Sequence, residues 1–175
     1  MAKLNVIKKG HLRILGGIVA GASSTVSFIH SDKKIIVDTG VSKDRKEIIF
    51  GLEKEGFSPG DIDIVINTHP HGDHMGNNNL FENAVLFENR DSKKICDDVE
   101  MIHTPGHTSN CYSVLVRTDQ GRVAIVGDLI ALEDDLDTGR KPHSYDFELQ
   151  KKNRKKIVEM SDHIVCGHGG MIERK

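Results

Sequence analysis

The segment Thr68-His69-Pro70-His71-Gly72-Asp73-His74 places three imidazoles and one carboxylate directly after the apolar residues 62–67. A metal-binding histidine must be neutral and held in one tautomer, and the Pro and Gly of this loop can aim successive side chains at different points. One loop could therefore serve two metal ions, with His69 and His71 at the first and Asp73 and His74 at the second. We expect a metal site here rather than a polar turn that happens to be rich in histidine.

Three later residues share the same context, since each follows an apolar strand and lies beside a glycine. They are His107 in Thr104-Pro-Gly-His-Thr108, Asp128 in Val126-Gly-Asp128 and His168 in Cys166-Gly-His-Gly169. These three residues and the loop 68–74 can meet at one edge of a sheet. The histidines that fit no such position are expected to be structural or exposed, and these are His11, His30, His103 and His163.

Short Val- and Ile-rich runs alternate with two helical stretches, which predicts a layered α/β fold. Strands are expected at 4–8, 11–16, 25–30, 34–38, 62–67, 84–87, 99–102, 112–117, 122–126 and 164–166. The first strand is predicted to pair with the second, and the third with the fourth. Helices are expected at 42–55, capped by Ser42 and ended by Gly56, and at 146–161. Strands inside and a helix at the end of each half suggest four layers, αββα.

The full set of motifs resembles the metallo-β-lactamase superfamily over residues 23–170, and Asp38-Thr-Gly40 is similar to a loop in its first half. The nearest likeness is to small hydrolases related to metallo-β-lactamase domain-containing protein 1. The resemblance implies the αββα sandwich of that fold. It also implies one metal ion on His69, His71 and His107, another on Asp73, His74 and His168, and Asp128 as the bridge.

That site implies hydrolysis by a hydroxide held between two divalent ions, with Asp73 and His74 as catalytic residues. Zinc is the expected metal, although donors without a thiolate also suit iron or manganese. Cys166, two residues before His168, could lie near the site but is expected to be an ordinary buried thiol.

The expected substrate is a small ester, thioester or lactone. The net charge of -2 and the acidic residues 133–137 disfavour a polyanion. A phosphodiesterase or ribonuclease activity at the same site stays open, because the domain-containing protein 1 group includes an RNA nuclease. A mononuclear-iron persulfide dioxygenase also stays open, whereas flavin-linked di-iron reductases are disfavoured because they carry Glu where His71 stands. Residues that could contact the substrate are Arg140, His143 and Tyr145.

Composition places the chain among soluble proteins, with 37% apolar and 29% charged residues among 175. That length suits a single domain over residues 1–175. No run approaches the roughly 18 apolar residues of a membrane span, and the first ten residues lack the apolar core of a secretion signal. Three cysteines without close spacing fit a reducing compartment, so we expect a cytoplasmic protein. So small a sandwich could also form a homodimer.

Overall fold

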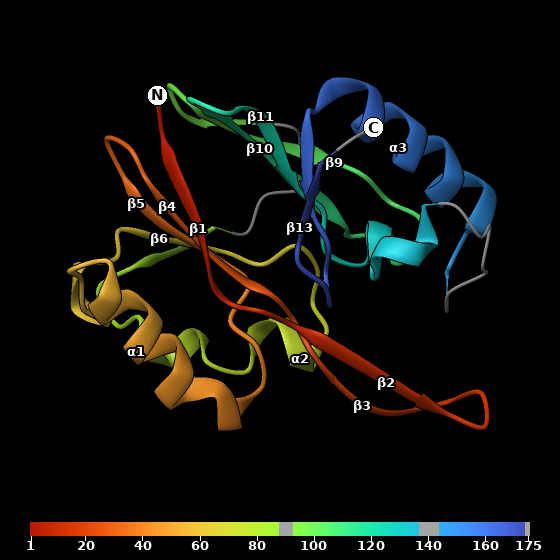
Figure 1. The fold of residues 1–175 in the computed structure, drawn as a ribbon, viewed down its shortest axis with the longest axis horizontal. Helices are drawn as coiled ribbons and strands as arrows, with labels where there is room; N and C mark the ends of the chain where they lie inside the picture. Colours follow the sequence, from red (N-terminus) through yellow and green to blue (C-terminus); the bar gives the residue numbers. More distant parts are fainter. Residues whose placement is uncertain (88–92, 137–143, 174–175) are drawn as a thin grey trace.

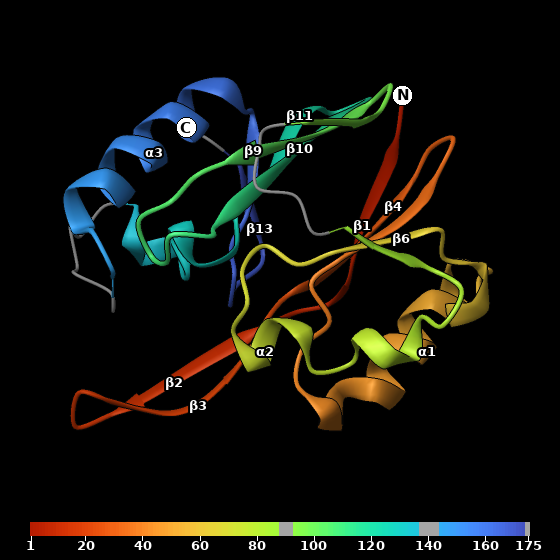
Figure 2. The same cartoon turned by 180° about the vertical axis from the view of Figure 1, so that it is seen from behind.

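A computed structural model describes residues 1–87, 93–136 and 144–173. Two sheets lie face to face, with one long helix on the outer side of each (Figure 1). The view from behind shows the same order, with α1 (Arg45–Lys54) and α3 (Phe147–Met160) on opposite sides of the molecule (Figure 2). The predicted four-layer αββα architecture is therefore confirmed.

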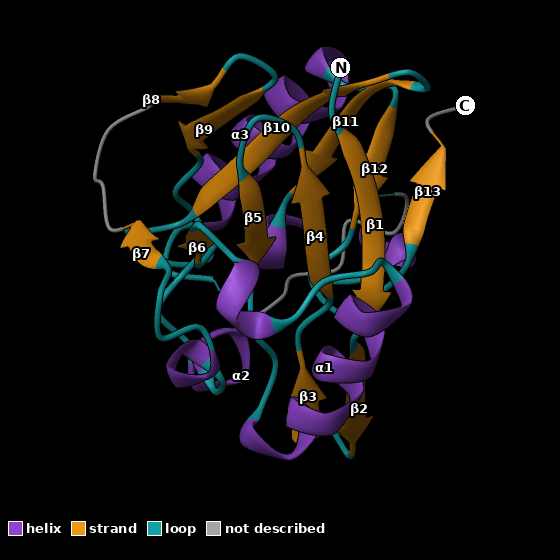
Figure 3. Cartoon of the chain, turned by 90° about the vertical axis from the view of Figure 1, so that its left-hand side faces the viewer, coloured by secondary structure: helices purple, strands orange, loops and turns teal. Residues whose placement is uncertain are grey.

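The first sheet has the order β1-β4-β5-β6-β7 (Figure 3). Its strands are β1 (Lys3–Lys8), β4 (Val26–His30), β5 (Lys34–Val37), β6 (Ile64–Ile66) and β7 (Val85–Phe87). β4 pairs antiparallel with β1 and β5, whereas β5, β6 and β7 run parallel to one another. The loops that follow β5 and β6 consequently leave the sheet at the same edge.

The second sheet has the order β13-β12-β11-β10-β9-β8. Its strands are β8 (Lys93–Cys96), β9 (Val99–His103), β10 (Tyr112–Thr118), β11 (Gly121–Ile125), β12 (His163–Val165) and β13 (Met171–Glu173). β11 and β12 are parallel, and the other pairs are antiparallel. The loops after β11 and β12 therefore also share one edge, as those after β5 and β6 do in the first sheet.

Three separate apolar clusters fill the three spaces between the four layers. In β5, Ile35 and Val37 pack between the sheets while Ile36 packs under α1 against Leu52. In β12, Val165 packs between the sheets and Ile164 joins the cluster that contains Ile157 of α3. Because successive side chains of a strand point to opposite faces, strands buried on both faces are apolar throughout.

Both predicted helices are present, with one correction, and five short helices were not predicted. α3 begins at Asp146, whose Oδ1 accepts a hydrogen bond of 2.9 Å from the N–H of Leu149. α1 is preceded by the short helix η1 (Ser42–Asp44), and the predicted cap at Ser42 is wrong, because the carboxylate of Asp44 instead accepts the Val41 N–H. Gly56 ends the helical region with a φ of 83°, as expected. Shorter helices are α2 (Gly72–Met75), η2 (Pro59–Asp61), η3 (Asn78–Leu80), η4 (Gly127–Ile130) and η5 (Glu133–Asp135).

The predicted pairing of the first two strands is wrong. β1 pairs with β4, and β2 (His11–Leu15) pairs with β3 (Ile18–Ser23) in a hairpin that extends past the body of the fold (Figure 1). Gly16 and Gly17 both have positive φ, at 58° and 81°, as a two-residue hairpin turn requires. β3, β8 and β13 had not been predicted, because their short sequences lack a clear apolar alternation.

No helix among the described residues is both long and apolar enough to cross a membrane.

Two substitutions on α1 test the layered packing. Leu52 is fully buried, whereas Phe50 on the same helix is 55% exposed. We expect Leu52→Ala to lower the free energy of unfolding by about 2–5 kcal/mol and Phe50→Ala to change it by less than about 1 kcal/mol. Denaturant unfolding of the two variants measures the difference, and equal losses would contradict this placement of α1.

Candidate metal centre

The loops after β5 and β6 of the first sheet meet the loops after β11 and β12 of the second sheet, and this brings the predicted residues together. Asp38 follows β5 and the loop 68–74 follows β6, while Asp128 follows β11 and His168 lies beyond β12. His107 lies in the loop between β9 and β10. All seven predicted ligand positions fall into two groups of converging donor atoms.

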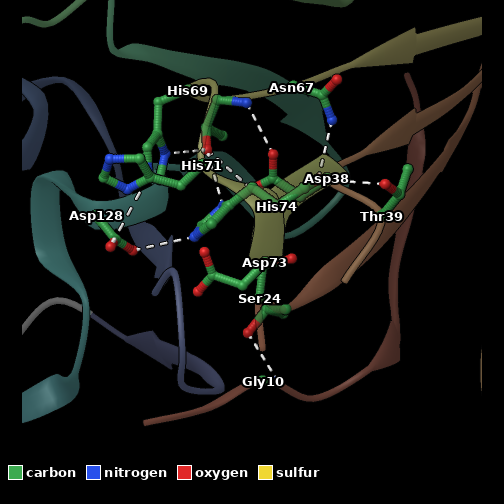
Figure 4. A network of polar contacts seen from close by, with 12 residues as sticks. Gly10, Ser24, Asp38, Thr39, Asn67, His69, His71, Asp73, His74 and Asp128 are labelled. Atoms are coloured by element: carbon green, nitrogen blue, oxygen red, sulfur yellow. Dashed lines mark hydrogen bonds and ion pairs between the residues drawn. The ribbon is translucent and has the colours of Figure 1, made fainter. Parts of the chain in front are cut away.

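The first cluster consists of His69, His71, His107 and Asp128, whose donor atoms lie within 4.8 Å of one another. Nδ1 of His71 is 2.9 Å from Nε2 of His69 and 3.1 Å from Nε2 of His107. Oδ2 of Asp128 is 3.4 Å from the same His107 atom. Three imidazoles and one carboxylate oxygen thus face a common point, and Figure 4 shows His69, His71 and Asp128 of this cluster.

The second cluster consists of Asp73, His74 and His168, again within 4.8 Å. Nε2 of His168 lies 3.6 Å from Oδ2 of Asp73. Oδ1 of Asp128 lies 3.3 Å from Nε2 of His74 and 3.1 Å from Nε2 of His168. One oxygen of Asp128 therefore faces the first cluster and the other faces the second.

Hydrogen bonds on the outer side of the second cluster fix its rings. Nδ1 of His74 is 2.8 Å from Oδ2 of Asp38, and Nδ1 of His168 is 2.9 Å from the carbonyl oxygen of Ser23. A carboxylate and a carbonyl can only accept, so each Nδ1 carries the proton and Nε2 is turned toward the cluster. Sequence reasoning had noted Asp38 without this role and had missed Ser23.

Neighbouring loops hold the backbone of the histidine loop. The carbonyl oxygen of His74 accepts the N–H of Thr39 at 2.7 Å and the amide of Asn67 at 3.0 Å (Figure 4). Asp38 itself accepts the N–H and the hydroxyl of Thr68, at 2.7 and 2.8 Å, and has a left-handed φ of 59°. A backbone conformation that side chains rarely adopt is consistent with a functional constraint at this position.

Burial and crowding set the protonation of the two clusters. Burial, together with the positive charge of neighbouring imidazoles, holds the pKa of His69 well below its ordinary value. Burial also disfavours the charged form of His74, but the carboxylates of Asp38 and Asp128 outweigh it and raise its pKa to about 10. For Asp128, burial is outweighed by the positive charge of His168 and His74, whose Nε2 atoms lie 3.1 and 3.3 Å from Oδ1, so its pKa falls well below the usual range.

The residues present fit bound metal ions. Nε2 of His74 and Oδ1 of Asp128 are buried atoms that lack a hydrogen bond of acceptable geometry. Buried polar atoms are rarely left without a partner, and a metal ion would supply one to both. Nitrogen and oxygen donors without a thiolate suit zinc, iron or manganese. The alternative donor, Cys166, packs in the apolar cluster beside α3, and burial raises the pKa of its thiol to about 12.

Of the three predicted substrate contacts, the structure describes Tyr145. Arg140 and His143 lie outside the described residues. The Tyr145 side chain is 76% exposed, while its N–H donates a 3.0 Å hydrogen bond to the carbonyl oxygen of His107. Its backbone thus holds the His107 loop, and contact of its side chain with a substrate stays a prediction.

Comparisons with known proteins point to one family. The sequence model of the metallo-beta-lactamase superfamily matches residues 19–88. The chain is 32% identical to metallo-beta-lactamase domain-containing protein 1 of Xenopus laevis, over 95% of this chain and 79% of that protein. It is 35% identical to a probable metallo-hydrolase of Methanocaldococcus jannaschii, over 81% and 73% of the two chains.

Solved structures show the same fold. A Thermotoga maritima crystal structure assigned to the metallo-beta-lactamases superposes with a TM-score of 0.78 at 26% identity, over 98% of this chain and 99% of that one. The dizinc quorum-quenching lactonase AidC superposes with a TM-score of 0.70 at 18% identity, over 87% and 75% of the two chains.

The fold and the converged histidine and aspartate residues define a metal-dependent hydrolase. The chain belongs to the metallo-beta-lactamase superfamily.

The carboxylate of Asp38 supplies the first test of the site. We expect Asp38→Asn to weaken metal binding by about 10–100-fold, because an amide no longer enforces the tautomer of His74. Competition with a coloured chelator measures the affinity, and the exposed Asp61→Asn is the matched control. Unchanged affinity in Asp38→Asn would show that His74 is oriented by something else.

Metal binding should also release a proton. With a pKa of about 10, His74 is protonated in the metal-free protein at pH 7.5, and an ion must displace that proton. Affinity should therefore rise with pH until about 10, because below that value a proton competes with the ion for His74. Titration calorimetry in two buffers of different ionisation enthalpy would detect the release of about one proton or more, and an absence of release would contradict this assignment.

Proposed function

We propose that this protein is a dinuclear hydrolase whose first ion binds His69, His71 and His107 and whose second ion binds Asp73, His74 and His168. Asp128 would contact both ions. The observation that carries the proposal is the position of the Asp128 carboxylate, with Oδ2 facing one cluster and Oδ1 the other. Zinc is the metal that we propose, with iron and manganese as alternatives.

Two such ions, when bound, would supply a hydroxide nucleophile at neutral pH and an electrophile for the substrate oxygen. The protein residues then have distinct tasks. His74 and His168 are buried and held by their Nδ1 atoms, so they fix the second cluster rigidly. The Asp73 side chain is 22% exposed, which suits it to orient the attacking water and to exchange a proton with solvent.

The proposed substrate is a small ester, thioester or lactone. Support comes from the likeness of fold to a dizinc lactonase and from the absence of a large positive charge that would collect a polyanion. Glu133 and Asp134 are exposed in η5, which follows η4 and its residue Asp128 in the chain, and they add negative charge there. They would repel a polyphosphate backbone more than a neutral ester.

We further infer that residues 1–175 act as one domain. Each cluster takes donors from both halves of the sequence, since His69 and His71 join His107, and Asp73 and His74 join His168. Neither half alone could bind either ion with the full set of donors.

The experiment combines metal analysis of the purified protein with a panel of substrates. A lactone, a thioester and bis-p-nitrophenyl phosphate are assayed on the same sample, and two zinc ions per chain with turnover of the lactone or thioester are expected. His71→Ala should lower kcat/KM by about 100-fold or more, because it removes a donor of the first cluster. The exposed His11→Ala is the matched control.

Each other outcome has a definite meaning. Turnover of the phosphodiester alone would assign the protein to the phosphodiesterases. A single iron ion with oxygen consumption and no hydrolysis would overturn the dinuclear mechanism and favour the persulfide dioxygenases.

A further inference from the structure

The end of β3 and the link to β4, residues 23–25, contact both loops that form the second cluster. The N–H of Ser24 donates to the carbonyl oxygen of Asp73 at 3.0 Å, and the carbonyl oxygen of Ser23 accepts Nδ1 of His168 at 2.9 Å. The N–H of Thr25 donates to the carbonyl oxygen of Gly167 at 2.7 Å. This link thus joins the Asp73 loop of the first half to the His168 loop of the second, and Figure 4 shows Ser24 beside Asp73.

A buried ion pair holds that link from its other side. Nζ of Lys8 lies 3.2 Å from Oδ2 of Asp44, and the two side chains are only 2% and 7% exposed. Lys8 also donates to the hydroxyl of Ser23 and, at 2.8 Å, to the carbonyl oxygen of Ser24. The Ser23 hydroxyl in turn donates to Asp44. The ammonium group therefore makes two hydrogen bonds and one ion pair within one small network.

The local backbone directs Lys8 toward this network, and its hydrogen bonds keep Asp44 ionised. Lys8 follows an irregularity between Val6 and Lys8 in the pairing of β1 with β4, and such a bulge re-aims the side chain that follows it. Burial would raise the pKa of Asp44, but hydrogen bonds from Ser23 and the Val41 N–H, with the charge of Lys8, lower it instead. Asp44 is therefore a carboxylate that accepts two hydrogen bonds and forms one ion pair.

Stability alone is a weak explanation for this pair. Two charges removed from water are often no more stabilising than apolar residues of similar size, because desolvation offsets their attraction. Fixed hydrogen-bond directions are what an apolar replacement cannot supply. Those directions act on Ser23 and Ser24, whose backbone groups contact His168 and Asp73.

We propose that Lys8 and Asp44 are positioning residues for the second cluster, which they control through Ser23 and Ser24. They set the affinity of the ion bound by Asp73, His74 and His168 and leave the first ion unaffected. The inference rests on the dinuclear hydrolase proposed above.

The test uses the double variant Lys8→Met/Asp44→Asn, which removes both charges and so leaves neither one buried alone. The amide oxygen introduced at position 44 can still accept the N–H of Val41. Metal-free protein is titrated with Zn²⁺ against a chelator, and His168→Ala identifies which equivalent belongs to the second cluster. We expect the double variant to bind that equivalent about 10–100-fold more weakly and the other as the unmutated protein does.

The control variant removes another ion pair of a lysine on β1. Lys3→Met/Glu55→Gln removes a 2.8 Å pair between β1 and the end of α1 and should leave both affinities unchanged. Thermal unfolding of the metal-free proteins is measured beside each titration. If the Lys8/Asp44 double variant does not fold, Ser23→Ala replaces it, since that change deletes only a neutral hydroxyl from the network, and the same selective loss is expected.

Three results would overturn the inference. Unchanged affinity for the second ion, or an equal loss at both clusters, would reduce Lys8 and Asp44 to a structural role and leave the hydrolase proposal standing. An unmutated protein that binds fewer than two ions would overturn the dinuclear proposal, and this inference with it.

Discussion

The carboxylate of Asp128 is the contact on which the site depends. It lies between two groups of imidazoles, with one oxygen 3.4 Å from His107 and the other 3.3 Å from His74. Asp128 follows β11 in the second sheet, whereas His74 follows β6 in the first, so its position is correct only when both sheets are packed face to face. The apolar cluster between the sheets therefore determines the geometry of the site as well as the stability of the fold, because it sets the distance between the sheet that carries Asp128 and the sheet that carries His74.

A layer of hydrogen-bond acceptors surrounds the donor atoms. Asp38 and the carbonyl oxygen of Ser23 bind the outer nitrogens of His74 and His168, and so direct the inner nitrogens to one point. These acceptors come from the ends of β5 and β3, next to the loops that they orient. The protein thus fixes the direction of its ligands through groups that never face the reacting centre.

Much of this arrangement could be predicted from the sequence, because the local signals were strong. The histidine loop, the glycines beside His107, Asp128 and His168, and the apolar strands before them indicated the layers and the seven converging residues. The partner of His74 could not be predicted from spacing, since Asp38 is 36 residues away and no local pattern links them. The contact between Lys8 and Asp44 could not be predicted either, because it depends on the bulge before Lys8 and on η1, and no local pattern links two residues that lie so far apart in the chain. The β2–β3 hairpin was missed because Gly16 reads as the end of a strand rather than as half of a two-residue turn.

The mixed origin of the donors has a consequence for folding. An ion that binds the assembled clusters but not the separated strands adds a free energy that grows with the logarithm of its free concentration. A bound metal ion would thus help to hold the two halves of the chain together, in addition to the apolar cluster between the sheets. The free energy of unfolding would then depend on the concentration of free metal ion. A chain that is stable in a metal-rich medium would be less stable where that metal is scarce.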